Sequence, residues 1–267
     1  MDRWKRKIAR RFYSFLKPAQ FSGAYSSFAD VPDVGAGYDG QGLTDAYIEN
    51  YLTRPEQCLN NPHSPGLHAL VKLANSLPGD VEILDFGGGY GTVRAALDAI
   101  YPLERSRFKV TLCETKAMIA SLRRVTAKMN GELGMTMAET IDPQAKFHIV
   151  YSGSSLQYLE FYSNILTIFS EIGENIIIDD LPTCNVGSFV ARQINYDPGF
   201  PAWVFNQDEI SQFFKNHGFH LNCLRENERM FSHENAPKHM LRESSSFFFS
   251  LVPNLDAKFQ LQKVTIR

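Results

Sequence analysis

Ile83-Leu84-Asp85-Phe86-Gly87-Gly88-Gly89-Tyr90-Gly91 is an apolar strand pattern that ends in an acid and runs into a glycine-rich turn. Apolar residues then recur at helical spacing over residues 93–100. Glycine accepts positive φ and lets a ligand approach the backbone closely. In an open α/β sheet such a turn lies at the carboxyl ends of the strands, where ligands bind. The stretch therefore predicts a buried strand, a ligand-binding loop and a helix.

Strand and helix patterns alternate on both sides of this loop. A helix is expected from Pro65 with Ser64 as its N-cap, and others within 93–100, 119–129, 159–172 and 207–216. Strands are expected at 81–85, 110–113, 135–137, 147–151, 176–178, 219–225 and 246–252. The last two lack a crossover helix between them and indicate an antiparallel hairpin. The prediction for residues 63–267 is one α/β domain of Rossmann-like type, with a mostly parallel seven-stranded sheet and helices on both faces.

Composition supports a folded protein and narrows its class. The chain has 267 residues, 44% of them hydrophobic and 21% charged, which suits one domain with additions. Its net charge of -2 argues against a nucleic-acid binder. The four cysteines are far apart in the sequence, which favours a reducing compartment and a cytoplasmic location over a zinc site. We expect neither a signal peptide nor a membrane-spanning helix.

The first 62 residues differ from the rest. Residues 1–18 carry Arg and Lys around a stripe of Trp4, Ile8, Phe12 and Phe15, which predicts a basic amphipathic helix. Such a helix either contacts an anionic membrane or packs on this domain or a second subunit. Residues 19–62 are rich in Gly, Ser, Asp and Pro and are expected to be irregular. Their Tyr25 and Tyr38 are candidates for a lid over the ligand, with packing on the sheet edge as the alternative.

The spacing of the glycine loop excludes two common ligands. A phosphate-binding P-loop ends in Gly-Lys-Ser/Thr, and no lysine precedes Thr92. A dinucleotide loop, G-x-G-x-x-G/A, would need Gly or Ala where Thr92 or Arg94 stands, depending on its first glycine. An acid two residues before the first glycine instead matches the S-adenosylmethionine loop. Its ligand carries an ammonium group, which Asp85 would hold directly or through water.

A second acid supports a nucleoside ligand. Glu114 directly follows the strand expected at 110–113, and a carboxylate there accepts hydrogen bonds from both ribose hydroxyls. A helix-capping role is the alternative for this residue. S-adenosylmethionine is therefore preferred to NAD as the cofactor. The predicted cofactor site consists of Asp85, Gly87, Gly88, Gly89, Tyr90, Gly91, Glu114, Ser152 and Gly153.

Further candidates follow the later strands. Asp179 and Asp180 are expected to end the fifth strand, where either carboxylate would accept a proton from the acceptor or orient it. The alternative is a surface turn before Pro182. We expect no metal, because Tyr151-Ser152 stands where a further carboxylate ligand would be needed. Trp203 is a candidate for stacking on a sugar ring, or else a buried core residue.

Four motifs resemble those of one family. They are DFGGGYG (85–91), YSGSSLQYLE (151–160), IIIDDLPT (176–183) and FPAWVFN (200–206), with FSGAYSSFADVPDVGAGYDG (21–40) before them. This pattern is similar to class I methyltransferases encoded among bacterial surface-polysaccharide genes, such as O-antigen clusters. That family has Asp-Arg where this chain has Asp179-Asp180, a departure that concerns the acceptor side.

The resemblance implies methyl transfer to a sugar hydroxyl or amine of a surface polysaccharide or its precursor. Two alternatives remain open from the sequence. One is a methyltransferase that acts on a small metabolite or a protein. The other is a non-catalytic scaffold that retains the cofactor-binding fold.

Overall fold

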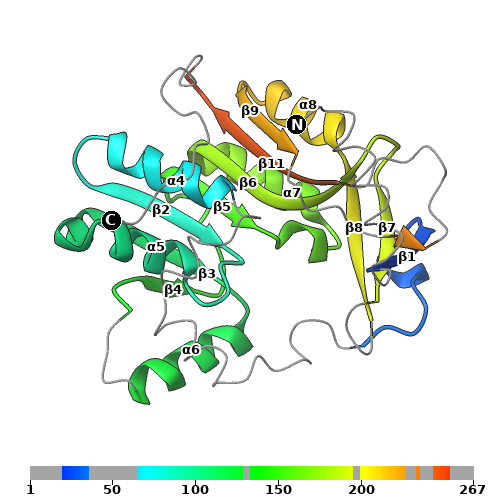
Figure 1. The fold of residues 1–267 in the computed structure, drawn as a ribbon, viewed down its shortest axis with the longest axis horizontal. Helices are drawn as coiled ribbons and strands as arrows, with labels where there is room; N and C mark the ends of the chain where they lie inside the picture. Colours follow the sequence, from blue (N-terminus) through cyan, green and yellow to red (C-terminus); the bar gives the residue numbers. More distant parts are fainter. Residues whose placement is uncertain are drawn as a thin grey trace, which may run out of the picture.

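The computed structural model describes residues 20–35, 65–128, 133–194, 199–226, 233–234 and 243–252 (Figure 1). The helix predicted for residues 1–18, and Tyr38, lie outside these residues. The described elements alternate between strands and helices from residue 65 onward, as the sequence predicts.

Five parallel strands form the centre of the sheet, in the order β4-β3-β2-β5-β6. Their bounds are β2 Val81–Phe86, β3 Phe108–Cys113, β4 Thr136–Ala138, β5 Phe147–Gly153 and β6 Gly173–Cys184. The middle strands β2 and β5 are almost wholly buried, which explains their near-continuous apolar sequences. Because all five run the same way, their carboxyl ends meet at one edge of the sheet.

The sheet is closed by the predicted hairpin. Strand β11 (Glu243–Ser250) pairs antiparallel with β6 and with β9 (His220–Glu226). A mostly parallel sheet with this antiparallel end is the class I methyltransferase architecture expected from the sequence, and that expectation is confirmed.

Helices cover both faces of the sheet. On one face lie α4 (Pro65–Ser76), α5 (Thr92–Ile100) and α6 (Lys116–Lys128), which pack on apolar residues of β2, β3 and β5. On the other face lie α7 (Tyr162–Ile172) and α8 (Gln207–Asn216), which bury phenylalanines of α7, α8 and β11. Short 3-10 turns complete the fold: η1 (Phe28–Asp30), η3 (Pro102–Arg107) and η4 (Leu156–Tyr158).

The sheet is larger than predicted. It has 11 strands among the described residues, whereas the sequence predicts seven. The four additional strands, which we call the accessory sheet, continue from the end of β6: β8 (Phe200–Asn206), β7 (Phe189–Gln193), β1 (Phe21–Tyr25) and β10 (His233–Glu234). The prediction that residues 19–62 are irregular is therefore wrong for β1. The accessory sheet was not predictable locally, because its partners come from three distant parts of the chain.

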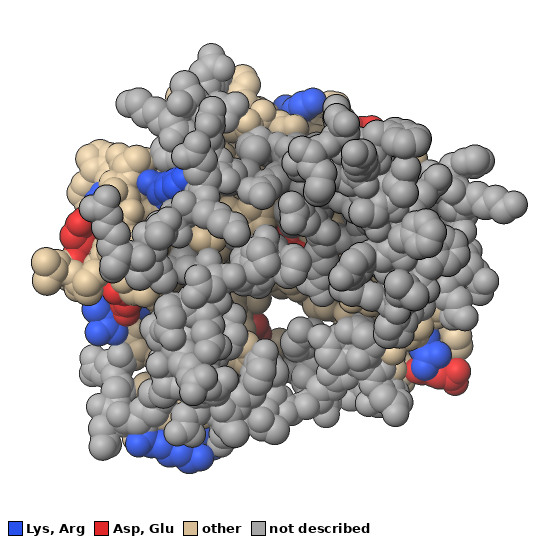
Figure 2. Space-filling view, in the orientation of Figure 1, with Lys and Arg blue, Asp and Glu red and all other residues tan. Residues whose placement is uncertain are grey.

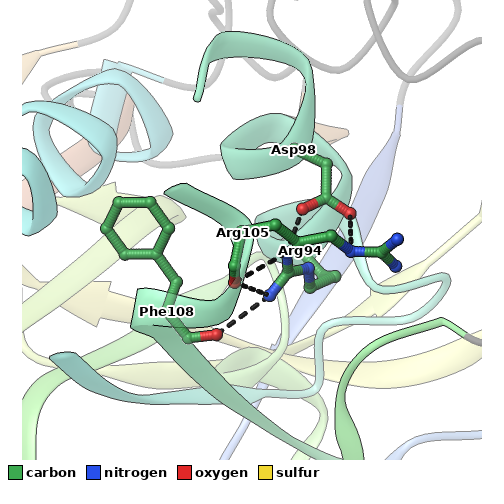
Figure 3. A network of polar contacts seen from close by, with 4 residues as sticks. All are labelled: Arg94, Asp98, Arg105 and Phe108. Atoms are coloured by element: carbon green, nitrogen blue, oxygen red, sulfur yellow. Dashed lines mark hydrogen bonds and ion pairs between the residues drawn. The ribbon is translucent and has the colours of Figure 1, made fainter. Parts of the chain in front are cut away.

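Arg94 joins helix α5 and the turn η3 to the start of strand β3. Its side chain is 3% exposed, and its guanidinium donates to the carbonyl oxygens of Phe108 at 2.9 Å and Arg105 at 3.2 Å (Figure 3). It also pairs with Asp98, which in turn contacts Arg105 at 3.2 Å. Arg94 stands where a dinucleotide loop counted from Gly89 would have its last Gly or Ala. In this protein it belongs to a structural network that joins α5, η3 and β3.

Both basic and acidic side chains of the described residues lie on the face of the protein drawn in Figure 2. On the face in Figure 2, the Lys and Arg side chains of the described residues lie apart from one another and do not form one patch. Among the described helices, none is both long and apolar enough to cross a bilayer.

Candidate cofactor and acceptor site

The glycine loop has the backbone that its sequence predicts. Gly87, Gly89 and Gly91 have φ of 64°, 57° and 79°, values that residues with a Cβ rarely adopt. The amide of Gly87 donates to the carbonyl of Cys113 at 2.9 Å, which holds the loop beside the end of β3. A Cβ at Gly87 would lie 2.4 Å from the Cβ of Ser155. The loop that follows β5 therefore packs directly against the glycine loop. The loop therefore lies at the carboxyl edge of the sheet.

Asp85 lies beneath this loop. Its side chain is 0% exposed, and within the described part of the chain neither carboxylate oxygen has a hydrogen bond of normal geometry. Burial raises the pKa of Asp85 to about 7, an effect that the nearby Val93 amide offsets in part and the charge of Glu114 increases. A Cβ at Gly88 would stand 2.2 Å from the carboxyl carbon, so the loop backbone covers the acid. Asp85 is thus a buried acid without a normal donor, directly under the loop.

Glu114 meets the loop from the next strand. Its carboxylate accepts from the amide of Gly89 at 3.0 Å and from the amide of Thr115 at 2.7 Å. Glu114 is only half-buried, and a carboxylate offers about four lone-pair positions. The same side chain thus fixes the loop and lies at the edge where ribose hydroxyls would be recognised.

The remaining predicted cofactor residues lie around the loop. Ser152 and Gly153 end β5, and the hydroxyls of Ser152 and Ser155 are 2.7 Å apart. Ser155 also donates to the carbonyl of Phe86 at 3.1 Å, which ties the β5 loop to the start of the glycine loop. Tyr90 is half-buried and packs on the apolar cluster under α6. The structure therefore brings all nine predicted cofactor residues to one edge of the sheet.

The sequence predicted that Asp179 and Asp180 end the strand that begins near Ile176. In the structure both acids lie within that strand, β6. Strand β6 continues to Cys184. On one side β11 pairs with it from Asn175 to Thr183, and on the other side β8 pairs with Thr183 and Cys184, beyond the end of β5. Pairing with β11 passes from Ile178↔Phe247 to Leu181↔Ser245, so the two acids share one partner, Ser246. This arrangement is a β-bulge, and the alternative of a surface turn is also wrong.

Asp179 is held inside the protein. It is 0% exposed and accepts from the hydroxyl of Tyr151 at 3.0 Å, the amide of Leu67 at 3.3 Å and the hydroxyl of Ser246. Burial raises its pKa to about 6, although the hydrogen bond from Ser246 lowers it. Burial, followed by the charges of Asp179 and Asp85, raises the pKa of Tyr151 well above its ordinary value. Tyr151 therefore remains a hydrogen-bond donor to Asp179.

Asp180 is more open than its neighbour. Its side chain is half-buried and accepts from the hydroxyl of Ser154 at 2.7 Å and from that of Ser244. Both Asp180 and Ser154 have positive φ, of 54° and 52°, which is uncommon for residues with a Cβ. Strained backbone of this kind concentrates at functional sites.

The aromatic candidates belong to the accessory sheet. Trp203 on β8 donates its indole N–H to the carbonyl of Leu159 at 3.1 Å, and its ring lies 5.2 Å from that of Tyr162 and 6.0 Å from that of Phe28. Tyr25 is half-buried on β1, beside Val190 of β7. The contacts of Trp203 are those of a ring packed in the protein. The lid role of Tyr25 stays a prediction.

Four hydroxyl groups that hold this edge together were not predicted from the sequence. Each contacts a predicted site residue or the glycine loop, and they belong to Tyr151, Ser154, Ser155 and Ser246. One signal was present in the sequence: Ser244-Ser245-Ser246 places three hydroxyls directly before a run of phenylalanines. Among the described residues, no group of three potential metal ligands lies together.

Comparisons with known proteins find similarity in fold. No protein-family pattern matches the chain, and no curated protein is detectably similar to it in sequence. A 1,6-didemethyltoxoflavin N1-methyltransferase from Burkholderia thailandensis, solved with S-adenosylhomocysteine, is 13% identical with a TM-score of 0.49, covering 83% of this chain and 92% of its own. Magnesium protoporphyrin IX methyltransferase from Synechocystis PCC 6803 is 12% identical with a TM-score of 0.47, over 92% and 94% of the two chains. The CcbJ methyltransferase from Streptomyces caelestis is 13% identical with a TM-score of 0.44, over 70% and 89%.

Proposed function

We propose that this chain is an S-adenosylmethionine-dependent methyltransferase. The observation that carries the proposal is the arrangement of Asp85, Gly89 and Glu114. A buried acid lies under a positive-φ glycine loop, and that loop is bonded at 3.0 Å to the acid of the next strand. The loop has no P-loop lysine before Thr92, and this edge offers two carboxyl groups for a ligand with an ammonium group and two ribose hydroxyls.

The described residues fit such a cofactor. Asp85 supplies a buried carboxyl group beneath the loop, and the positive-φ glycines allow a ligand to approach the backbone. Glu114 lies half-buried at the same edge, where its carboxylate accepts from the amides of Gly89 and Thr115 and is the group that would recognise the ribose hydroxyls. When bound, S-adenosylmethionine supplies a methyl group made electrophilic by its sulfonium. The protein's own contribution is to place the acceptor in line with that methyl group and to accept its proton.

We further propose a sugar hydroxyl or amine as the acceptor. The segments that resemble surface-polysaccharide methyltransferases lie against one another in the fold. The ring of Tyr158 is 5.2 Å from that of Phe200, and Trp203 donates to Leu159. These contacts bring η4 and β8 beside the carboxyl-terminal half of β6, the half that also carries Asp180. The acceptor proposal rests on this convergence of motifs, and a small metabolite or a protein remains the alternative acceptor.

Methyl transfer from labelled S-adenosylmethionine into a fractionated bacterial extract tests both parts. Label in the polysaccharide or lipid-linked glycan fraction supports the full proposal. Label in small molecules or protein keeps the methyltransferase and contradicts the glycan acceptor. Binding of the cofactor without transfer into any fraction would favour the non-catalytic scaffold.

A further inference from the structure

The β-bulge in β6 places two consecutive acids on the same face of the sheet. In a regular strand, neighbouring side chains point to opposite faces, and a bulge breaks that alternation. Ser246 donates to Asp179, and Ser244, two residues away on the same strand, donates to Asp180. Since Ser244 and Ser246 share one face of β11, both carboxylates lie on the α4 side.

Asp179 is enclosed by three elements on that side. Its donors come from the first turn of α4, from β5 and from β11. The helix presses closely on it, because a Cβ at Gly66 would stand 2.6 Å from the carboxyl carbon of Asp179. With a 0% exposed side chain and these donors around it, Asp179 has no open side toward an acceptor.

Asp180 is presented differently. Its half-buried carboxylate is held by hydroxyls from two sides, Ser154 and Ser244, whereas Asp179 lies fully buried under the first turn of α4. The side-chain amide Nε2 of Gln157 donates to the carbonyl of Ser154 at 2.9 Å and helps to hold the strained loop that supports Asp180. The carboxylate is therefore fixed in direction and, unlike that of Asp179, is only half-buried.

Ser246 connects the two acids. Its hydroxyl donates to the carboxylate of Asp179 and accepts from the backbone amide of Asp180 at 3.4 Å. A change at Asp179 would thus reach the backbone of Asp180 through one side chain. The positive φ of Asp180 shows that this backbone is held away from its relaxed conformation.

We propose that Asp180 is the carboxylate that takes the acceptor's proton, and that Asp179 is a positioning residue that holds the bulge in place through Ser246, Tyr151 and α4. This inference rests on the proposed function. The acceptor's lone pair forms the new bond to the methyl carbon, the electron pair of the broken C–S bond stays on sulfur, and the acceptor's proton passes to Asp180. Asp179 keeps its hydrogen bonds throughout and touches no reacting atom.

The test compares Asp179→Asn, Asp180→Asn and Ser246→Ala, with Ser245→Ala as the matched control. Ser245 is the buried neighbour on β11 whose hydroxyl contacts Thr183 and Gln207 instead. Two readouts are taken: transfer from labelled S-adenosylmethionine into the accepting extract fraction across pH, and amide hydrogen exchange of the unliganded protein. Binding of S-adenosylhomocysteine by calorimetry is measured first, so that loss of the cofactor site is recognised separately.

Asp180→Asn should lower transfer by about 10²–10⁴-fold and remove the acidic limb of the pH–rate profile, without changing exchange in α4. Asp179→Asn should speed exchange in the first turn of α4 by about tenfold, and lower transfer by up to about 10²-fold with the acidic limb retained. Ser246→Ala should lower transfer as Asp179→Asn does, while Ser245→Ala leaves it near wild type.

An acidic limb lost in Asp179→Asn and kept in Asp180→Asn would overturn the assignment. Wild-type protein that binds no S-adenosylhomocysteine would overturn the proposed function, and unchanged α4 exchange in Asp179→Asn would still contradict the positioning role.

Discussion

The backbone of Gly88 lies on the carboxylate of Asp85, so closely that a Cβ at position 88 would stand 2.2 Å from the carboxyl carbon. This contact explains why an acid and a glycine are both required within one short turn. The acid is buried by the loop that it supports, and the loop can close only where no side chain intervenes. The turn and its acid therefore act as one unit in the proposed cofactor site.

The buried acid makes stability depend on pH. The pKa of Asp85 rises from 3.8 to about 7 on folding, so the folded protein binds the extra proton between these values. Stability from this group is complete below pH about 4 and is lost as pH rises through about 7. Asp85→Asn should therefore be more stable than wild type at pH 8, by about 2–4 kcal/mol. Urea unfolding at pH 5 and pH 8 measures this, and equal stabilities at pH 8 would contradict the burial of an ionised Asp85.

Gly88→Ala should disrupt the glycine loop. The added Cβ would stand 2.2 Å from the carboxyl carbon of Asp85, which is fully buried, so one of the two groups must shift. We expect a loss of about 1–3 kcal/mol from overpacking, together with weaker binding of S-adenosylhomocysteine. Gly187→Ala is the control, because among the described residues its Cβ would meet only Glu209, at 3.9 Å. Equal unfolding midpoints for the two variants would show that the loop does not press on Asp85.

Arg94→Leu should destabilise the fold without a direct effect on cofactor contacts. The change leaves the carbonyls of Phe108 and Arg105 without their donor and Asp98 without its buried partner (Figure 3). We expect a loss of about 2–4 kcal/mol, seen as a lower midpoint in thermal and urea unfolding. If Arg94 instead contacted the ligand, S-adenosylhomocysteine affinity would fall while the midpoint stayed unchanged.

The sequence predicted the central sheet and the cofactor loop well, because both depend on local patterns. Asp85, the glycines and Glu114 are close in sequence to the strands that place them, and the loop has the predicted geometry. The bulge at Asp179 could not be predicted in this way. Pro182 suggested a turn, whereas pairing with β11, more than 60 residues away, carries the strand onward.

The accessory sheet was missed for the same physical reason. Strand β1 contains Gly23 at φ 70° and reads as a loop, yet β7 and β10 pair with it from distant segments. The hydroxyl network around Asp179 also joins α4, β5 and β11, which no local periodicity brings together. Contacts of this kind depend on tertiary pairing rather than on propensity.

The basic segment of residues 1–18 remains a prediction about location. Its aromatic stripe surrounded by Arg and Lys should bind anionic vesicles at low salt and be released at high salt. Flotation of the full chain with phosphatidylserine vesicles measures this, with a chain beginning at Gln20 as the control. Full-length protein that stays unbound at low salt would favour packing of the helix on this domain or on a second subunit.

Calorimetric titration of the purified protein with S-adenosylhomocysteine and with NAD tests the central claim most directly. We expect S-adenosylhomocysteine to bind and NAD not to bind. We also expect Glu114→Ala to weaken binding of S-adenosylhomocysteine by about 1–3 kcal/mol, because a ribose acceptor and the hydrogen bond to Gly89 are lost together. Tight NAD binding without S-adenosylhomocysteine binding would contradict the account.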